Sequence, residues 1–440
     1  MSRSLVLLIY NLLLPVFFIV AFPAWLLKMC KRGGYGTGLL ERFGSFSAEA
    51  SEEPRQGVYI HAVSVGEVFI ALKLIKQWLL VEPDLKVVLA ATTSTGHEVA
   101  LDNAPSEVRV IYSPLDFNTI VTAVLERFRP RQIVLIEAEL WPNFVNVARQ
   151  MEIPVAMVNA RLSKRSELRF KKFEALVEPL FEMVSLVCVQ NEIDAERFAT
   201  LGIDRSLIHV TGSVKFDPAG GSSPQKRDAF QSILADFGVD VEGARKVVLL
   251  ASSHDGEEKL LANAIRLLAV EALLVVVPRH AERRAQVVAD LQSSGFDVIL
   301  SSQYRVPKDI AKACLVIDTT GELCDWTAHA DVAVIGKSWL ARGGQNPAEA
   351  IAAEVPVITG PHMQNFEPLV SMLQDAGGII TLASADELGH RINELLVGGE
   401  QVREMCRKAK NVLATHENAG QKTIKLLNMN ASVRGGIMQE

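Results

Sequence analysis

Two acidic residues stand where apolar, strand-like runs give way to loops. Glu67 follows His61–Gly66 (HAVSVG), and Glu137 closes the run Ile133–Glu137. An acid in the first turn of a helix complements the positive end of the helix dipole, which explains Glu67 without any function. The same dipole would keep the carboxylate ionised near pH 7, as a general base requires. Glu67 is therefore a candidate catalytic base, with helix capping as the structural alternative.

The same chemistry could involve three further polar residues of this half, namely Glu139, Arg161 and Lys215. Glu137 and Glu139 would share one face of an extended strand, and burying unpaired carboxylates is costly, which favours a function for this pair. Arg161 follows the next strand-like run. Lys215, in the stretch GSVKFD, could reach a phosphate as a point charge, although a solvated surface lysine fits equally well.

The C-terminal half carries four polar loops, each at the start of a predicted helix. Their candidate binding residues are Ser252, Ser253 and His254; Pro278 and Arg279; Thr320, Gly321 and Glu322; and Gly343, Gly344, Asn346, Pro347, Ala348 and Glu349. The last loop has a capping pattern, with Asn346 before the helix, Pro347 at its first position and Glu349 reaching back. Capping does not require the two preceding glycines, which would let the backbone approach a ligand closely. Because helix N-termini bind anions, the four loops together predict a nucleotide or phosphate pocket.

The composition and the remaining motifs argue against several kinds of site. The 440 residues are 49% apolar and 22% charged with a net charge of −6, so the charge balance indicates no nucleic-acid partner. The five cysteines form no C-x-x-C pair, which indicates neither a disulfide framework nor a zinc site and fits a reducing compartment. Gly336-Lys-Ser lacks the P-loop glycine, since Asp331 stands at its position, and no G-x-G-x-x-G follows the first strand. The nine histidines are dispersed, so we expect no metal ion and no cofactor.

Residues 4–27 form an uncharged segment of mostly Leu, Val, Ile and Phe. As a helix they span about 36 Å, more than a hydrocarbon core of about 30 Å, whereas a signal peptide has a shorter apolar region and a small-x-small cleavage site. Three basic residues follow within 28–32, so the positive-inside rule places the rest of the chain in the cytoplasm. Two prolines and Asn11 inside the segment leave open a helix that lies in the membrane interface.

Short β-branched runs alternate with amphipathic stretches from Gly57 onward, which predicts parallel sheets built from βαβ units. The predicted strands are Val58–Ala62, Lys86–Ala91, Ile133–Glu137, Pro154–Val158 and Ser185–Val189 in the first half, and Lys246–Ala251, Ala272–Val277, Leu315–Ile317, Val332–Ile335 and Val355–Ile358 in the second. A stretch rich in Gly, Pro and Ser separates the halves. We therefore predict an α/β fold of two Rossmann-like domains that face a cleft, over residues 33–215 and 227–425, with a linker over 216–226 and a membrane anchor over 4–27.

In order and spacing, these motifs resemble those of the Kdo transferases, which attach 3-deoxy-D-manno-octulosonic acid (Kdo) to the lipid A precursor. The most specific stretches are HAVSVGE, EAELWPN, NARLS, QNE, GSVKFD, VPRH, GEL and RGGQNPAEA. The resemblance covers nearly the whole chain. The sequence departs from the family pattern at Lys337, where glycine is common, and at Gln345, where histidine is common.

The resemblance implies the two-domain glycosyltransferase B (GT-B) fold and an inverting, metal-independent transfer from CMP-Kdo to lipid IVA. It makes Glu67 the catalytic base, and Glu137 and Lys215 the stabilisers of the transition state. The implied location is the cytoplasmic side of the cell inner membrane. The implied CMP-binding residues are Pro278, Arg279, Thr320, Gly321, Glu322, Asn346, Pro347, Ala348 and Glu349.

Other functions are compatible with the same pattern. Another membrane-associated glycosyltransferase with a UDP-sugar donor, or a sugar-nucleotide epimerase, would keep the fold and would bind UDP in preference to CMP. A non-catalytic membrane scaffold would bind no nucleotide, and it would leave the joint occurrence of Glu67, Glu137 and Lys215 unexplained.

Overall fold

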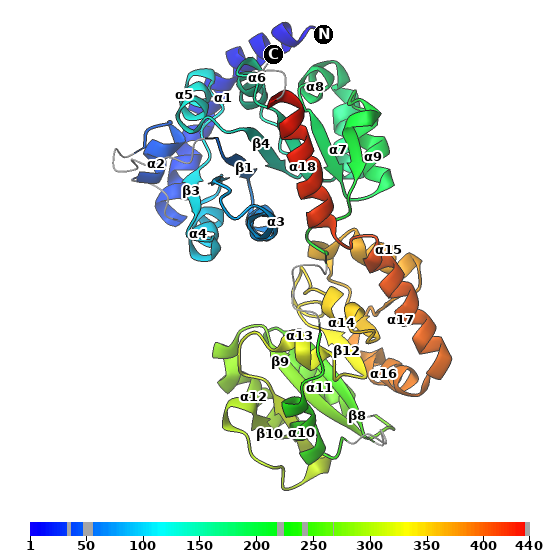
Figure 1. The fold of residues 1–440 in the computed structure, drawn as a ribbon. Helices are drawn as coiled ribbons and strands as arrows, with labels where there is room; N and C mark the ends of the chain where they lie inside the picture. The colour runs from blue at the N-terminus through cyan, green and yellow to red at the C-terminus, as the bar shows by residue number, and fades with distance from the viewer. Residues whose placement is uncertain (33–36, 47–55, 218–223, 240–244, 267, 436–440) are drawn as a thin grey trace. The chain divides into compact units, whose positions relative to one another are not determined.

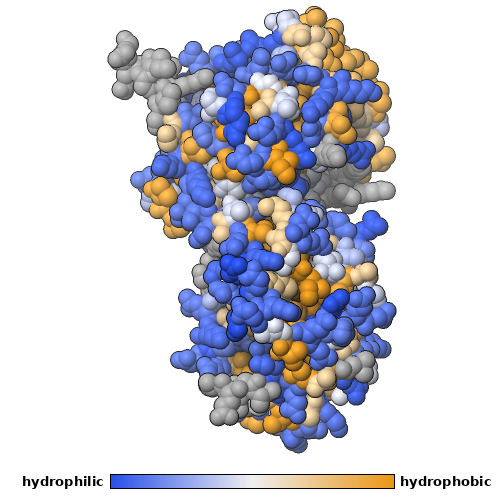
Figure 2. Space-filling view, turned by 90° about the vertical axis from the view of Figure 1, so that its right-hand side faces the viewer, coloured by the Kyte–Doolittle hydropathy of each residue, from blue (hydrophilic) through white to orange (hydrophobic). Residues whose placement is uncertain are grey.

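The chain folds into two units, each built on one parallel β-sheet (Figure 1). The first unit comprises Met1–Gly220 and His416–Glu440, and the second comprises Gly221–Thr415. The computed structural model describes all residues except 33–36, 47–55, 218–223, 240–244, 267 and 436–440. On the face that Figure 2 shows, apolar surface gathers along one margin of the first unit, at the top of the view. The α/β class predicted from the sequence is confirmed in both units.

Seven strands form the sheet of the first unit, in the order β3-β2-β1-β4-β5-β6-β7 with every pair parallel. They are β1 (Val58–Ala62), β2 (Val87–Ala91), β3 (Val108–Tyr112), β4 (Gln132–Ile136), β5 (Val155–Ala160), β6 (Leu186–Val189) and β7 (Ile208–Val210). The five inner strands are buried along their whole length, as expected for near-continuous apolar runs with helices on both faces. The strand order reverses between β1 and β4.

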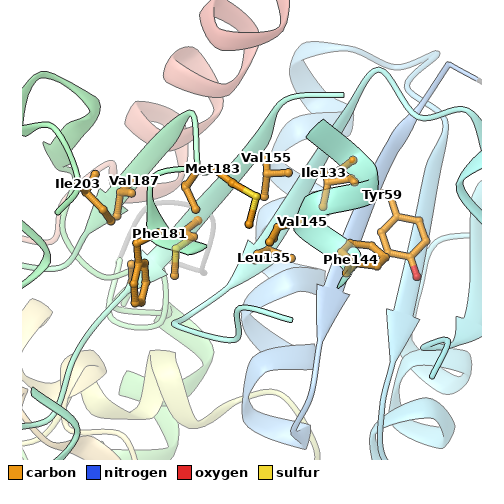
Figure 3. Close-up of a cluster of buried hydrophobic side chains, with 14 of the residues drawn as sticks. Tyr59, Ile133, Leu135, Phe144, Val145, Val155, Phe181, Met183, Val187 and Ile203 are labelled. Atoms are coloured by element: carbon orange, nitrogen blue, oxygen red, sulfur yellow. The ribbon is translucent and has the colours of Figure 1, made fainter. Parts of the chain in front are cut away.

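Helices cover both faces of this sheet. They are α1 (Arg3–Arg32), α2 (Thr37–Arg42), α3 (Val65–Val81), α4 (Ser94–Asn103), α5 (Asn118–Phe128), α6 (Pro142–Gln150), α7 (Lys164–Lys172), α8 (Glu174–Phe181), α9 (Glu192–Ala199) and α18 (Ala419–Gly435), with one 3-10 turn η1 (Arg205–Leu207). One face buries Tyr59 and Ile133 of the sheet with Phe144 of α6 and Phe181 of α8 (Figure 3). The other face buries a second cluster, which includes residues of α3 and α18.

The second unit repeats the plan with the strand order β10-β11-β9-β8-β12-β13-β14, again all parallel. Its strands are β8 (Lys246–Ser253), β9 (Ala272–Pro278), β10 (Asp297–Leu300), β11 (Ala313–Val316), β12 (Val332–Ile335), β13 (Val357–Thr359) and β14 (Ile380–Thr381). Its helices are α10 (Asp228–Asp236), α11 (Glu257–Ile265), α12 (Arg284–Ser293), α13 (Leu323–Thr327), α14 (Ala348–Ala352), α15 (Leu369–Asp375), α16 (Leu388–Val397) and α17 (Gly399–Ala414), with 3-10 turns η2 (Ala281–Arg283), η3 (Ser301–Gln303), η4 (Ile310–Lys312), η5 (Gln364–Phe366) and η6 (Ala385–Glu387). The strand order reverses between β8 and β12.

Every strand predicted from the sequence coincides with an observed strand, with small shifts at the ends. The strands that the pattern missed are β3, β7, β10 and β14. These four are the edges of the two sheets. Edge strands bury less of their length, so β3, β7 and β10 carry polar residues and β14 has only two residues. An apolar run is therefore a poor signal for them.

The C-terminal boundary differs from the prediction, because the second unit ends at Thr415 and not at residue 425. The Asp217 carboxylate accepts hydrogen bonds from Asn418 N at 3.0 Å and Gly420 N at 2.9 Å, which fixes the start of α18 on the first unit. Leu427 of α18 lies in the core of that unit. Of the predicted linker 216–226, residues 218–223 lie outside the described residues, and Phe216 and Asp217 are buried in the first unit.

Burial of Leu427 explains why the C-terminal helix returns to the first unit. Its side chain is 0% exposed, so Leu427→Ala should lower the free energy of unfolding by about 2–5 kcal/mol. Met429 on the same helix is 56% exposed, and Met429→Ala is the matched control, with an expected effect within about 0.5 kcal/mol. Thermal or denaturant unfolding in detergent measures both. Equal effects of the two substitutions would show that α18 does not contribute its Leu427 face to the core.

Candidate active site

The polar loops of the first unit meet at the carboxyl edge of its sheet, around the point where the strand order reverses. β1 and β4 are hydrogen-bonded neighbours there. Glu67 follows β1, and Glu137 follows β4. Open parallel sheets bind ligands at such a point. The topology therefore brings together two acids that lie far apart in the sequence.

Glu67 closes the turn between β1 and α3. Its Oε2 accepts a hydrogen bond from Val63 N at 2.8 Å, and its Oε1 accepts one from Ser64 Oγ at 2.8 Å. Ser64 Oγ in turn accepts from Glu67 N at 3.3 Å, as the cap of α3. This reciprocal arrangement is close to a capping box. The structural explanation offered for Glu67 from the sequence is therefore correct in part.

Burial raises the pKa of Glu67 to about 7, despite the opposing hydrogen bonds from Val63 and Ser64. The carboxyl groups of Glu137 and Glu139 lie close enough to contribute to the rise. We expected the helix dipole to keep Glu67 fully ionised at pH 7, and burial together with the acidic neighbours overrides that effect. A carboxyl group with this pKa gains and loses a proton readily at neutral pH, as acid–base catalysis requires.

Glu137 adopts a left-handed backbone conformation directly after β4, with a φ of 59°. Because the strand ends at Ile136, Glu137 and Glu139 do not share a strand face as predicted; they lie in the turn that follows. A left-handed conformation costs a non-glycine residue about 1–2 kcal/mol, and such strain clusters at functional sites. The Oε1 of Glu137 lies 3.4 Å from Nε of Arg161.

Asn159 connects the loop that carries Lys215 to the middle of the sheet. It sits at an irregularity of β5 with a φ of 54°. Its Oδ1 accepts hydrogen bonds from Val214 N at 2.9 Å and Ser213 Oγ at 3.1 Å. The residue immediately before Lys215 is therefore anchored to β5, the strand beside β4.

Lys215 belongs to the same group of charges as Glu137 and Arg161. Much of its side chain is open to solvent, yet surrounding atoms desolvate the ammonium group and lower its pKa, an effect that Arg161 increases and Glu137 opposes. The structure thus brings Glu67, Glu137, Arg161 and Lys215 to one edge of the first unit. Glu139, the other acid of the pair expected from the sequence, has a pKa that is raised by burial and by Glu137.

His61 is a buried neighbour of this group that the sequence analysis did not single out as a separate residue. Burial lowers its pKa to about 4, so the imidazole is neutral at pH 7. Its ring packs against Trp141 and Phe144, with centroid distances of 5.9 and 5.8 Å. Trp141 belongs to the loop after Glu139, so His61 supports that loop from β1. Its place in HAVSVGE was the available signal.

The second unit also places its polar loops at the carboxyl edge of its sheet. The four loops predicted to bind a nucleotide follow β8, β9, β11 and β12. These strands are consecutive in the order β11-β9-β8-β12, and the last two flank the reversal of the strand order. The predicted convergence of the four loops is therefore present within this unit.

Glu257 joins the two loops at this reversal, a role that the sequence analysis missed. Its side chain is 0% exposed. Its carboxylate accepts hydrogen bonds from His254 N at 3.0 Å, Lys337 N at 2.6 Å and Trp339 N at 3.0 Å. Lys337 has a φ of 54°, which gives a physical reason for the glycine that is common at this position. An acid in a first helical turn was again the only signal.

The loop after β8 is shaped mainly by structural hydrogen bonds. Ser252 occupies an irregularity of β8 with a φ of 56°. Ser253 Oγ donates to Glu258 Oε1 at 2.8 Å, and Glu258 is paired with Arg283 at 3.0 Å. Ser253 and the backbone of His254 therefore hold the loop in place. Ser252 marks the same kind of position in this sheet as Asn159 does in the first.

Arg279 and Glu349 link the loops after β9 and β12. The backbone N of Arg279, the residue after Pro278, donates to Ser253 O at 3.1 Å, and its side chain is exposed. Burial raises the pKa of Glu349, and the Arg279 guanidinium opposes that rise, so the two charges lie near each other. The guanidinium is placed where it can meet an anion at the edge of the sheet.

The turn after β11 exposes Thr320 and Gly321. Gly321 has a φ of 87° with open space where a Cβ would be. Glu322 accepts a hydrogen bond from Thr319 Oγ1 across the turn. This hydrogen bond within the turn fixes its conformation. The backbone of Thr320 and Gly321 stays accessible to a ligand.

The helix after Gly343, Gly344 and Asn346 starts later than predicted, and the two glycines make close contacts within the chain. α14 begins at Ala348, one residue later than predicted, and Asn346 Oδ1 accepts from Ala348 N at 3.1 Å. The glycines have φ values of 124° and 75°. A Cβ on Gly343 would lie 2.6 Å from Asn365 Nδ2, and one on Gly344 would lie 2.4 Å from Met363 Sδ. The close approach thus occurs within the chain, next to Pro347 and Ala348, which are buried.

Acidic and histidine side chains of the described residues form no group of three or more that could hold a metal ion. Cationic side chains at the two sheet edges include Arg161 and Lys215 in the first unit and Arg279 in the second. Each of them could neutralise an anionic substrate without any added ion.

Comparison with known proteins points to one enzyme family. Residues 37–218 match the family model described as 3-Deoxy-D-manno-octulosonic-acid transferase (kdotransferase). The chain is 33% identical over 399 residues to the 3-deoxy-D-manno-octulosonic acid transferase of Haemophilus influenzae, which covers 89% of this chain and 91% of that protein. It is 32% identical over 420 residues to the enzyme of that name from Bordetella pertussis, covering 92% and 94%.

The fold is similar to that of solved glycosyltransferases. The structure of MurG from Acinetobacter baumannii has a TM-score of 0.52 at 13% identity and covers 86% of this chain and all of that one (100%). At that identity the likeness concerns the fold alone, which is GT-B. With the match to the curated enzymes over most of its length, the chain belongs to the Kdo transferase family of GT-B glycosyltransferases.

Proposed function

We propose that this protein transfers Kdo from CMP-Kdo to lipid IVA on the cytoplasmic side of the inner membrane, with Glu67 as the general base. Membership of the family supports the donor and the sugar. The observation that carries the mechanism is the placement of Glu67, with a pKa of about 7, beside Glu137 and Glu139 at the reversal of the strand order.

In this proposal the transfer is a single inverting displacement. Glu67 removes the proton from a sugar hydroxyl of the acceptor, and that oxygen forms a bond to the anomeric carbon of Kdo. The bond from this carbon to the phosphate oxygen of CMP breaks, and its electron pair leaves with CMP. Glu137 favours the charged form of Lys215, and Asn159 anchors the preceding residue, Val214. The positive charge of Lys215 stabilises the negative charge that develops on the departing group.

The second unit binds the CMP moiety in this proposal. Arg279 binds the phosphate through its guanidinium. Backbone groups of Thr320–Glu322 and Asn346–Glu349 contact the nucleoside. The transfer then requires no metal ion, because side-chain cations of the protein neutralise the phosphate. Glu257 contributes indirectly, since it holds the loops after β8 and β12 in one arrangement.

The membrane location follows from the chemistry of the acceptor. Lipid IVA carries acyl chains and stays in a bilayer, so the enzyme must be held there. The segment Arg3–Ala24 of α1 has a mean hydropathy of 2.7 and is long enough to cross a membrane. Basic residues follow it in the sequence at Lys28, Lys31 and Arg32, which favours the cytoplasmic side.

Substitution of Glu67 tests the base. Glu67→Gln keeps the size of the side chain and an oxygen that can accept from Val63 N, but it cannot take a proton. We expect CMP release with CMP-Kdo and lipid IVA to fall roughly 10²–10⁴-fold, while CMP binding measured by calorimetry stays unchanged. A near-normal rate in the variant would rule out Glu67 as the base. Preferential binding of UDP over CMP by the wild type would instead indicate a UDP-sugar enzyme.

The pH dependence of the reaction tests the environment of Glu67. The base must be deprotonated, so kcat/KM should rise with pH through about 7, the pKa of Glu67. Glu139→Gln removes a negative charge that raises this pKa, so the acid limb should move to lower pH. Glu126, an exposed residue of α5, provides the control Glu126→Gln, which should leave the limb in place. Identical profiles for all three proteins would contradict the assignment.

Arg279 tests the donor site independently of the base. Arg279→Ala removes a charge-assisted contact to phosphate, and we expect the Kd for CMP to rise about 10- to 100-fold. The control is Arg305→Ala, because Arg305 pairs with Asp297 at the start of β10, at the opposite end of the strands from the polar loops. If both variants bound CMP as the wild type does, the phosphate would lie elsewhere.

A further inference from the structure

Helix α1 has two unlike faces along its length. One face is the less exposed and carries side chains four residues apart, namely Val6, Tyr10, Leu14, Phe18 and Phe22. The other face consists of large apolar side chains that are 59–75% exposed, namely Leu12, Leu13, Val16, Phe17, Ile19 and Val20. A helix that crosses lipid alone would have no reason to divide its sides in this way.

Two polar side chains of α1, Tyr10 and Asn11, fasten the helix to the first unit. Tyr10 Oη donates to Asp116 Oδ2 at 2.8 Å. Asn11 and Asn143 exchange two amide hydrogen bonds, at 3.0 and 2.8 Å. Asp116 and Asn143 are 3% and 0% exposed, so these contacts are part of the folded unit. Asp116 also accepts from Asn143 N and Phe144 N, which fixes the start of α6.

Apolar contacts continue the attachment further along the helix. The ring of Phe18 packs edge-on against Phe117 at 5.6 Å and Phe43 at 6.5 Å. α1 also contacts α4, α6 and α8. From Val6 to Phe22 the helix rises about 24 Å, which is most of a hydrocarbon core of about 30 Å.

A spanning helix is incompatible with contacts over that length. To cross the bilayer while packed on the first unit, α1 would draw α4, α6 and α8 into the hydrocarbon. Those helices carry exposed charges such as Asp102, Arg149 and Glu174. Charged side chains in the hydrocarbon are strongly disfavoured. Either the contacts break in the membrane, or the helix does not cross it.

We propose that α1 lies in the plane of the membrane, fastened to the first unit along one side and embedded in the acyl chains of one leaflet along the other. The proposal rests on the membrane location given under the proposed function. An in-plane helix needs an apolar outer face and a polar opposite side, and here the folded unit takes the place of the polar side.

The surface next to α1 also suits contact with a membrane leaflet. α8 contacts both α1 and α7. α7 exposes Arg169, Lys171 and Lys172 together with Leu168, which is 63% exposed. Basic side chains interleaved with apolar ones suit a leaflet with anionic headgroups. A second copy of the chain, with the same basic surface, would gain no such attraction.

The arrangement has a consequence for the acceptor. Asp116 and Asn143 follow β3 and β4, so α1 is fastened at the carboxyl edge that also carries Glu137. An in-plane α1 therefore holds this edge at the level of the headgroups, where the sugar hydroxyls of a lipid acceptor lie. The helix then does more than retain the enzyme at the membrane, because it also sets the height of the candidate base.

Side-specific labelling tests the orientation. Ser4→Cys, at the start of the helix, is treated with a membrane-impermeant maleimide in intact spheroplasts and in inside-out vesicles, and modification at residue 4 is mapped by mass spectrometry. An in-plane helix predicts labelling in inside-out vesicles only. Labelling from the periplasmic side, or labelling that needs detergent in both preparations, would overturn the proposal.

Cross-linking tests whether the packed arrangement persists in the membrane. Phe18→Cys with Phe117→Cys should form an intramolecular cross-link with a short bifunctional maleimide in membranes, because the two rings are in contact. The matched control is Phe17→Cys with Phe117→Cys, since Phe17 is 70% exposed on the other face and should not cross-link. Absence of the first cross-link, or an intermolecular cross-link through residue 17, would also overturn the proposal.

These outcomes are separable from failure of the proposed function. A protein that releases CMP normally but is labelled from the periplasm would disprove only the orientation of α1. A protein labelled as expected that transfers no Kdo would disprove only the reaction. Loss of the protein from floated membranes would disprove the shared assumption that it is bound to a bilayer.

Discussion

Parallel pairing is the constraint on which the rest of this structure depends. Because every pair of strands in both seven-stranded sheets is parallel, all strands of a sheet end at the same edge, and the loops that follow them are neighbours. The order of the strands reverses once in each sheet, between β1 and β4 and between β8 and β12. The residues with the strongest chemical signals lie on either side of these two reversals, where a ligand can approach the backbone.

Buried carboxylates fix the loops at both reversals of the strand order. Acidic residues therefore shape the backbone around the candidate site, and one of them is also the candidate base. Glu67 closes one turn with its carboxylate and still has a pKa of about 7. Glu257 accepts three backbone hydrogen bonds and links two loops. Four residues at strand ends, Glu137, Asn159, Ser252 and Lys337, hold left-handed conformations. Strain of that kind persists only where surrounding contacts over-determine the backbone, as they do around a preorganised site.

The first unit contains helices from both the N-terminal and the C-terminal part of the chain. α18 returns to it through Asp217 and Leu427, and α1 joins it through Asp116 and Asn143. Both attachments use buried polar groups whose hydrogen bonds would be lost on separation, which is costly in a low-dielectric interior. The apolar helix α1 and the sheet edge that carries Glu137 therefore belong to one folded body, and changes in α1 reach the loop that carries Glu137 through a short chain of contacts.

The sequence by itself determined what depends on local pattern: the inner strands, the apolar N-terminal segment, the order of the polar loops, and the residues Glu67, Glu137, Lys215 and Arg279 with the family that they indicate. Only the tertiary structure decided what depends on neighbours distant in the chain. Edge strands lack the buried run that reveals a strand, the acids after β4 lie in a turn, and the glycines before α14 make room for Met363 and Asn365. The pKa of Glu67 likewise follows from burial and from Glu137 and Glu139, because desolvation and Coulomb interactions arise only once the chain has folded.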